Sequence, residues 1–162
     1  VPHLAVKTFE TFREIFPPLK GFALFDCIPN LKNNPRLNIQ CWKKREVENY
    51  FARPHVLIRY ANLLASIRHR DKKANDLEKA MEEVINDNTA PAYLRNLDDP
   101  WWSEEKLTDN WLDKIIPRFY EKVGLPQAIW KRDYHEIISQ MKPSEIDKEI
   151  KEKLDILLPV IS

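Results

Sequence analysis

The chain has 162 residues, of which 26 are lysine or arginine, 25 are aspartate or glutamate and only two are glycine. This length suits one domain that buries a core without disulfides or a structural metal. The near-neutral charge argues against a protein that binds nucleic acid over its whole surface, and two glycines exclude a glycine-rich phosphate loop within the chain.

Two cysteines without metal-ligand spacing predict a reduced, cytoplasmic setting. No apolar run reaches the roughly 20 residues that cross a bilayer, so no membrane partner is expected. The chain opens at Val1 without an initiator methionine, and we therefore expect a fragment or an excised domain.

The first third of the chain predicts one helix and two strands. Apolar residues at helical spacing indicate a helix over 4–16, which two successive prolines end. The apolar run 22–25 is typical of a strand buried on both faces, and alternation over 37–42 indicates a second strand after a loop at 28–36. Two strands are too few for a stable sheet, so we expect further strands upstream or in a larger assembly.

The rest of the chain predicts helices. Apolar stripes at helical spacing indicate helices over 54–67, 74–85, 107–123 and 133–141. The third of these is expected to kink or break near its proline, Pro117, and to end at Gly124. Ser144 with Asp147 resembles a capping box that opens a last helix.

These elements predict a helix-rich α/β fold. We expect a parallel sheet of few strands over 1–53 and a helical elaboration over 54–162 that packs on it as one compact unit.

Acidic residues follow both predicted strands: Asp26 follows the first, and Glu46 and Glu48 follow the second. Functional groups gather beyond the carboxyl ends of parallel strands, and Mg²⁺ prefers carboxylate oxygens. The pattern therefore suggests a metal site that acts on phosphodiesters. Because Glu46 and Glu48 are two positions apart, we expect only one to bind metal directly. The simpler alternatives are a turn-capping Asp26, an ion pair of Glu46 with a neighbouring lysine or arginine, and a Glu48 carboxylate in the charged first turn of a helix.

Basic and aromatic residues offer candidate contacts with nucleic acid. Lys43, Lys44 and Arg45 adjoin the acidic residues and are candidate contacts for a DNA backbone, and a second basic cluster lies at 68–73. Solvated helix surface is the simpler interpretation of both clusters. Core packing is expected, with base stacking as the alternative, for four tryptophans: Trp101, Trp102, Trp111 and Trp130.

The segments Ala23–Asp26 and Trp42–Phe51 resemble the Toprim domains attached to bacterial ATPases of the overcoming-lysogenization-defect type. The resemblance covers about residues 20 to 158, and it extends to Pro54, Arg59–Tyr60, Lys131–His135 and Glu149–Asp155.

This resemblance implies a metal-dependent DNA endonuclease that acts in phage defence and uses one or two Mg²⁺ or Mn²⁺ ions. By position, it implies that Asp26 and Glu48 bind metal, that Glu48 also takes part in catalysis, and that Lys131 stabilises charge in the transition state. The implied partners are DNA, an upstream ATPase domain of the same polypeptide and further copies of the chain.

One position departs from the family pattern. Ile28 stands where the second aspartate of an Asp-x-Asp motif is expected, and no strand glutamate precedes residue 20. Either the first strand lies upstream or this copy is degenerate. The alternative functions are therefore a catalytically degenerate interaction or assembly module and a plain helical protein-binding domain.

Overall fold

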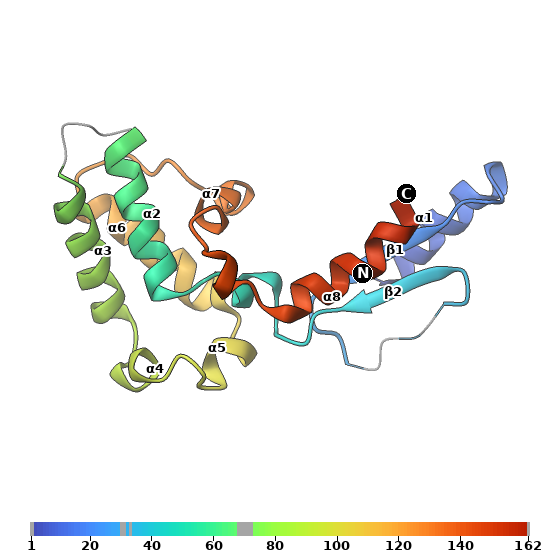
Figure 1. The fold of residues 1–162 in the computed structure, drawn as a ribbon, viewed down its shortest axis with the longest axis horizontal. Coiled ribbons are helices and arrows are strands. Elements are labelled where there is room, and N and C mark those ends of the chain that lie inside the picture. Colours follow the sequence, from blue (N-terminus) through green and yellow to red (C-terminus); the bar gives the residue numbers. More distant parts are fainter. Residues whose placement is uncertain (1, 30–31, 33, 68–72, 162) are drawn as a thin grey trace. The chain divides into compact units, whose positions relative to one another are not determined.

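The described structure is mostly helical and contains two strands (Figure 1). The computed structural model describes residues 2–29, 32, 34–67 and 73–161. The helix-rich α/β class predicted from the sequence is confirmed, and so is the parallel pairing of the strands.

The described helices and strands follow one another in the order α1 Pro2–Ile15, β1 Gly21–Phe25, β2 Leu37–Cys41, η1 Val47–Tyr50, α2 Pro54–Ile67, α3 Ala74–Asn88, α4 Pro91–Arg95, α5 Trp101–Glu104, η2 Thr108–Leu112, α6 Asp113–Lys122, η3 Lys131–Asp133, α7 His135–Ile138, η4 Pro143–Glu145 and α8 Lys148–Ile161.

The chain divides into two compact units. Unit 1 comprises residues 1–45 and 147–162, and unit 2 comprises residues 46–146. The sequence-based division after residue 53 placed η1 with the strands and α8 with the helices, whereas the structure groups η1 with the helices and α8 with the strands.

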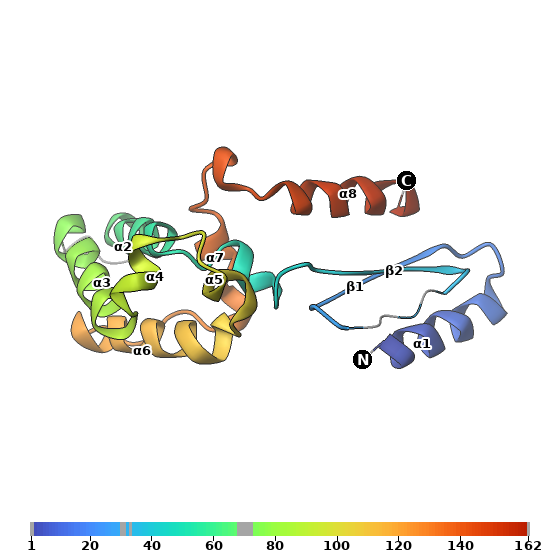
Figure 2. The same ribbon diagram turned by 90° about the horizontal axis from the view of Figure 1, so that it is seen from below.

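Unit 1 is built around the parallel pair β1 and β2. The register runs from Gly21 opposite Leu37 to Phe25 opposite Cys41, and the amide of Trp42 extends the ladder by donating to the carbonyl of Phe25 at 2.9 Å. Helices α1 and α8 lie on opposite faces of this pair (Figure 2). Every residue of β1 is half-buried rather than buried on both faces as predicted, because β1 has only one neighbouring strand in the described sheet.

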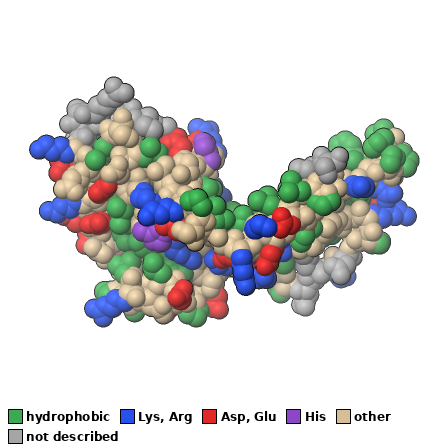
Figure 3. All heavy atoms as spheres, viewed as in Figure 1, with side chains coloured by type: hydrophobic (Ala, Val, Ile, Leu, Met, Phe, Trp, Pro, Cys, Tyr) green, Lys and Arg blue, Asp and Glu red, His purple; other side chains and the backbone are tan. Residues whose placement is uncertain are grey.

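The buried core of unit 1 is small, and its described members are Phe9, Leu37 and Ile39. Gly21 lets this core close, since a Cβ at that position would lie 2.5 Å from the Phe9 ring and 2.6 Å from Leu37. Figure 3 shows hydrophobic side chains on the surface of this unit along α8. The large apolar residues exposed on α1, on α8 and in the turn after α1 include Leu4, Phe12, Ile15, Phe16, Leu154, Ile156 and Leu158.

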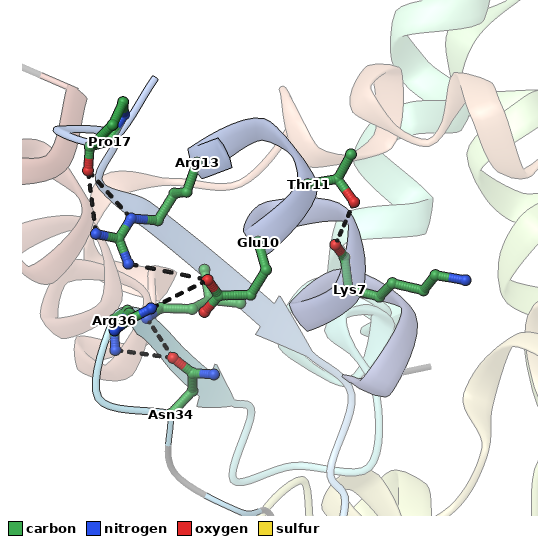
Figure 4. Close-up of polar contacts among 8 residues, drawn as sticks. Lys7, Glu10, Thr11, Arg13, Pro17, Asn34 and Arg36 are labelled. Carbon is green, nitrogen blue, oxygen red and sulfur yellow. Dashed lines mark hydrogen bonds and ion pairs between the residues drawn. The ribbon is translucent and has the colours of Figure 1, made fainter. Parts of the chain in front are cut away.

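Polar contacts fix the approach to β2 (Figure 4). The side-chain oxygen of Asn34 accepts hydrogen bonds from the amides of Arg36 and Leu37, at 2.8 and 2.9 Å, so it turns the chain into the strand. The guanidinium of Arg36 pairs with Glu10 of α1 at 3.6 Å. These contacts tie the start of β2 to α1.

Unit 2 is helical and holds the larger core. Helices α2, α3 and α6 pack together, and the hydroxyls of Tyr60 and Tyr120 meet at 2.8 Å within the core. Trp102 and Trp111 are buried and pack edge to face, with ring centroids 5.2 Å apart. The expectation of core packing is confirmed for these two tryptophans, whereas Trp130 is exposed.

Of two predicted features of the third helix, one is wrong and one is confirmed. The third predicted helix does not break at Pro117, which lies inside α6; a π-helical turn, η2, precedes α6 instead. Gly124 ends the helical segment as predicted, with a φ of +68° that suits glycine.

The last helix also opens differently from the prediction. The carboxylate of Asp147 accepts from the amide of Glu149 at 3.0 Å, and α8 begins at Lys148. Ser144 lies in the separate turn η4.

Candidate functional site

Glu48 and Lys131, both predicted as catalytic residues, form an ion pair in unit 2. The Nζ atom of Lys131 lies 2.9 Å from Oε1 of Glu48. The Glu48 side chain is 4% exposed, whereas that of Lys131 is 62% exposed. The pair therefore joins a buried carboxylate to a lysine whose side chain is mostly exposed, and an anionic ligand that contacts this lysine would share it with Glu48.

The backbone around Glu48 is fixed by a short 3₁₀ turn. The carbonyl of Glu48 accepts from the amides of Phe51 and Ala52, at 3.2 and 2.8 Å. Phe51 and Ala52 are themselves buried. The glutamate is therefore presented from a closed turn rather than from a flexible loop.

Glu46 makes a different contact from Glu48. Its side chain is buried, and Oε1 accepts a hydrogen bond from the amide of Thr108 at 2.6 Å. This amide belongs to the first residue of η2, so the carboxylate caps that turn. The two glutamates thus have separate partners, and the partner of Glu46 is a backbone amide rather than the neighbouring lysine or arginine that we expected.

Asn49 joins η1 to α5 and to the residue that follows α5. Its Oδ1 accepts from the amide of Glu46 at 2.9 Å, and its Nδ2 donates to the carbonyls of Trp102 and Glu105, both at 3.0 Å. The side chain is fully buried. Together with buried Tyr50, it supports the turn rather than offering a reactive group.

A cavity of about 650 Å³ lies beside Lys131 in unit 2. Tyr134 lines it, and burial raises the pKa of this phenol, helped by the carboxylates of Asp113, Glu48 and Glu46. Tyr134 therefore stays protonated at neutral pH and does not act as a base there.

Asp26 lies in unit 1, at the carboxyl end of β1, and its side chain is exposed. Within the described residues, no group of three or more His, Cys, Asp or Glu side chains is arranged to hold a metal ion. Glu46 is engaged with a backbone amide, and Glu48 with Lys131. The described residues by themselves therefore do not fit the Mg²⁺ or Mn²⁺ site that the resemblance implies.

The basic residues proposed as DNA contacts meet acidic partners within unit 1. Lys44 pairs with Asp147 at 2.7 Å, and Lys43 pairs with Glu152 at 3.4 Å. The amide of Lys43 also donates to buried Glu149 at 2.9 Å.

These acidic partners were not identified from the sequence. The mixed signs over residues 143–155 are the signal that could have indicated them, because a helix that carries charges of both signs typically forms salt bridges on its surface. Burial alone would raise the pKa of Asp147, but the hydrogen bond and charge of Lys44 outweigh it and lower that pKa.

The other basic positions differ. Arg45 is exposed, and its carbonyl accepts from the amide of Cys27 at 3.2 Å. The second basic cluster lies at residues 68–72, outside the described residues, apart from exposed Lys73.

A polar cluster in unit 2 was not predicted. Glu145 pairs with Arg59 and lies 3.5 Å from His55. The Nε of Arg59 donates to the carbonyl of Gln140 at 2.7 Å. Burial lowers the pKa of His55, and nearby Glu145 only partly opposes this effect. The cluster ties α2 to the segment around η4.

Comparison with known proteins gives no relative: no family model, no curated protein and no solved structure matches the chain. In the parts of the chain that the structure describes, no helix has both the length and the apolar character needed to cross a membrane.

Proposed function

We propose that the chain is the DNA-contacting portion of a Toprim-like, metal-dependent DNA endonuclease of the ATPase-linked type. The observation that carries this proposal is the ion pair of Glu48 and Lys131. Both residues were selected from separate segments of the sequence as catalytic candidates, and they meet at 2.9 Å.

In this proposal, Lys131 acts on the phosphate. An ammonium group is a compact point charge, and it stabilises the negative charge that develops on a phosphodiester as it is cleaved. Glu48 is a positioning residue: its buried carboxylate holds the ammonium in place, while the exposed side of Lys131 faces the ligand. The chain thus contributes charge stabilisation and orientation.

The proposed metal chemistry needs ligands beyond those that the described residues bring together. Bound Mg²⁺ or Mn²⁺ would activate water and neutralise phosphate charge. Within unit 1, exposed Asp26 is the proposed ligand from this chain. The upstream ATPase domain, self-association, a role in phage defence and a cytoplasmic location belong to the same proposal and depend on the resemblance.

Plasmid nicking in the presence of Mn²⁺ tests the proposal. Lys131→Ala is expected to lower the nicking rate about 100-fold or more, which is the usual cost of losing one group that stabilises transition-state charge. Lys122→Ala is the matched control, because Lys122 pairs with Glu83 at the same 2.9 Å but lies on another helix surface. Equal nicking by wild type and Lys131→Ala would refute the assigned role.

The second candidate is an interaction module without catalysis. The observation that favours it is β1, an apolar strand that is only half-buried and borders a groove of about 480 Å³ lined by Leu4, Phe12 and Phe22. β1 has one neighbouring strand in the described sheet, so its other edge suits a further strand. Absence of nicking with either metal, together with concentration-dependent association that Phe12→Ser weakens, would favour this candidate over the nuclease.

A further inference from the structure

We propose that the cavity beside Lys131 binds an unpaired DNA base, with Trp130 as its stacking partner. This inference rests on the proposed function, since it identifies the part of the DNA that unit 2 holds. It assigns a role to Trp130, which has no part in the function proposed for the ion pair of Glu48 and Lys131.

Trp130 is presented from a fixed position. Trp130 is 56% exposed, whereas Trp102 and Trp111 are buried in the core. The amide of Trp130 donates to a carboxylate oxygen of Asp133 at 3.0 Å, and its carbonyl accepts from the amide of Asp133 at 2.7 Å. An exposed indole on a closed turn is a ready platform for stacking, because little ordering is needed when a base arrives.

The cavity next to this indole combines apolar residues with an amide, a phenol and charged groups in its lining. Leu112, Ile116 and Ile129 are buried residues of its wall. Gln127 donates through Nε2 to the carbonyl of Ile129 at 2.8 Å, which holds its amide in the lining. A flat aromatic ligand with amino and carbonyl groups on its edge matches this combination of surfaces.

The charges around the cavity indicate which part of a nucleotide enters it. Arg132 and Lys131 line the cavity and are 82% and 62% exposed. Asp113 also lines it, and its carboxylate makes no ion pair within the described part of the chain. A phosphate inside would be repelled by Asp113, whereas one at the rim gains from Arg132. The base therefore enters the cavity and the phosphate stays at the rim.

A base can use this site only when its faces are not already stacked. In duplex DNA both faces are covered by neighbouring base pairs, and extrusion costs a few kcal/mol. The expected ligand is therefore single-stranded or locally opened DNA. A hydrophobic side chain of a protein partner would also fit the apolar wall, but it would not use the cations at the rim.

Fluorescence anisotropy with short labelled oligonucleotides tests this proposal, with EDTA present to prevent cleavage. Oligo(dT) is compared with an abasic oligonucleotide of equal length. Wild type is expected to bind oligo(dT) at least about fivefold more tightly, since stacking on one aromatic side chain typically contributes that much or more. Trp130→Ala should remove the preference, and Trp130→Phe should retain part of it.

Two further variants separate stacking from charge. Arg132→Gln should weaken binding of both oligonucleotides alike and reduce the salt slope by about 0.7, the value for one phosphate contact on a single strand. Leu97→Ala, a change at an apolar residue that is 37% exposed, should leave the preference intact.

Equal binding of the two oligonucleotides by wild type, or a preference that survives in Trp130→Ala, overturns the proposal. Loss of the preference in Trp130→Ala but not in Trp130→Phe supports it, because Phe keeps an aromatic ring at this exposed position whereas Ala removes it. The nicking assay gives an independent result: intact nicking with equal oligonucleotide binding refutes the base site alone. A base preference without nicking by wild type refutes the nuclease and leaves the base site standing.

Discussion

Asn49→Ala should destabilise unit 2 more than its small size suggests. The substitution removes three hydrogen bonds, from the amide of Glu46 and to the carbonyls of Trp102 and Glu105. The three backbone groups that lose a partner are not equivalent. The carbonyl of Trp102 keeps a weak contact with Arg53 at 3.5 Å, and the carbonyl of Glu105 belongs to a part-buried bond that water can replace.

The magnitude follows from these differences. The buried amide of Glu46 loses its side-chain acceptor, which costs about 1–3 kcal/mol. The two carbonyls retain alternatives, so each adds about 0.5 kcal/mol. The free energy of unfolding should therefore fall by about 2–4 kcal/mol in Asn49→Ala.

Urea unfolding followed by tryptophan fluorescence measures this loss. Asn88→Ala is the matched control, because Asn88 makes one part-buried hydrogen bond, to the carbonyl of Val84 at 2.7 Å. We expect the control to lose at most about 1 kcal/mol. If Asn49→Ala loses no more than Asn88→Ala, the reasoning that Asn49 joins η1 to α5 and to the residue that follows α5 is wrong.

Three further predictions concern charge and packing. A double-mutant cycle of Glu48→Gln and Lys131→Met should give a coupling free energy of about 1 kcal/mol or less, because Lys131 is mostly exposed to solvent; a coupling several times larger would contradict an accessible ammonium. Gly21→Ala should cost about 1–3 kcal/mol in unfolding free energy, since its Cβ would lie 2.5 Å from Phe9, and Phe9→Leu in the same chain should recover part of the loss. Because the folded pKa of Asp147 lies below its usual 3.8, its stabilising effect is present above the unfolded pKa and is lost as the pH falls through the folded pKa. Denaturant unfolding between about pH 6 and pH 3 should therefore show a shallower loss of stability in Asp147→Asn than in wild type.

The sequence predicted the elements of unit 1 because local patterns carry that information. The apolar run of β1 and the alternation of β2 placed both strands, and the predicted parallel pairing is confirmed. What the pattern missed is the coverage of β1: an apolar run indicates a strand that can be buried on both faces, but it does not supply the neighbour that buries it.

The roles of the charged residues were harder to predict, because their partners are distant in the chain. Glu46 and Glu48 look alike in the sequence, yet one caps η2 and the other holds Lys131. The contact of Asn49 with Trp102 joins segments that no local pattern connects. Only the resemblance singled out Lys131, since one lysine before a short turn has no periodic signal.

The charged block that the sequence grouped into one site is divided at the boundary between Arg45 and Glu46. Its basic half meets acidic residues within unit 1, as in the pair of Lys44 and Asp147. A phosphate that approached Lys44 would have to displace that carboxylate, which cancels much of the gain. Arg45 in unit 1 is exposed, and it makes no ion pair within the described residues. Arg132 in unit 2 lies 3.6 Å from the carboxylate of Asp133, in a longer and more exposed pair than that of Lys44 and Asp147. Electrostatics therefore favours these arginines over Lys44 as phosphate contacts, since an incoming anion displaces less from them.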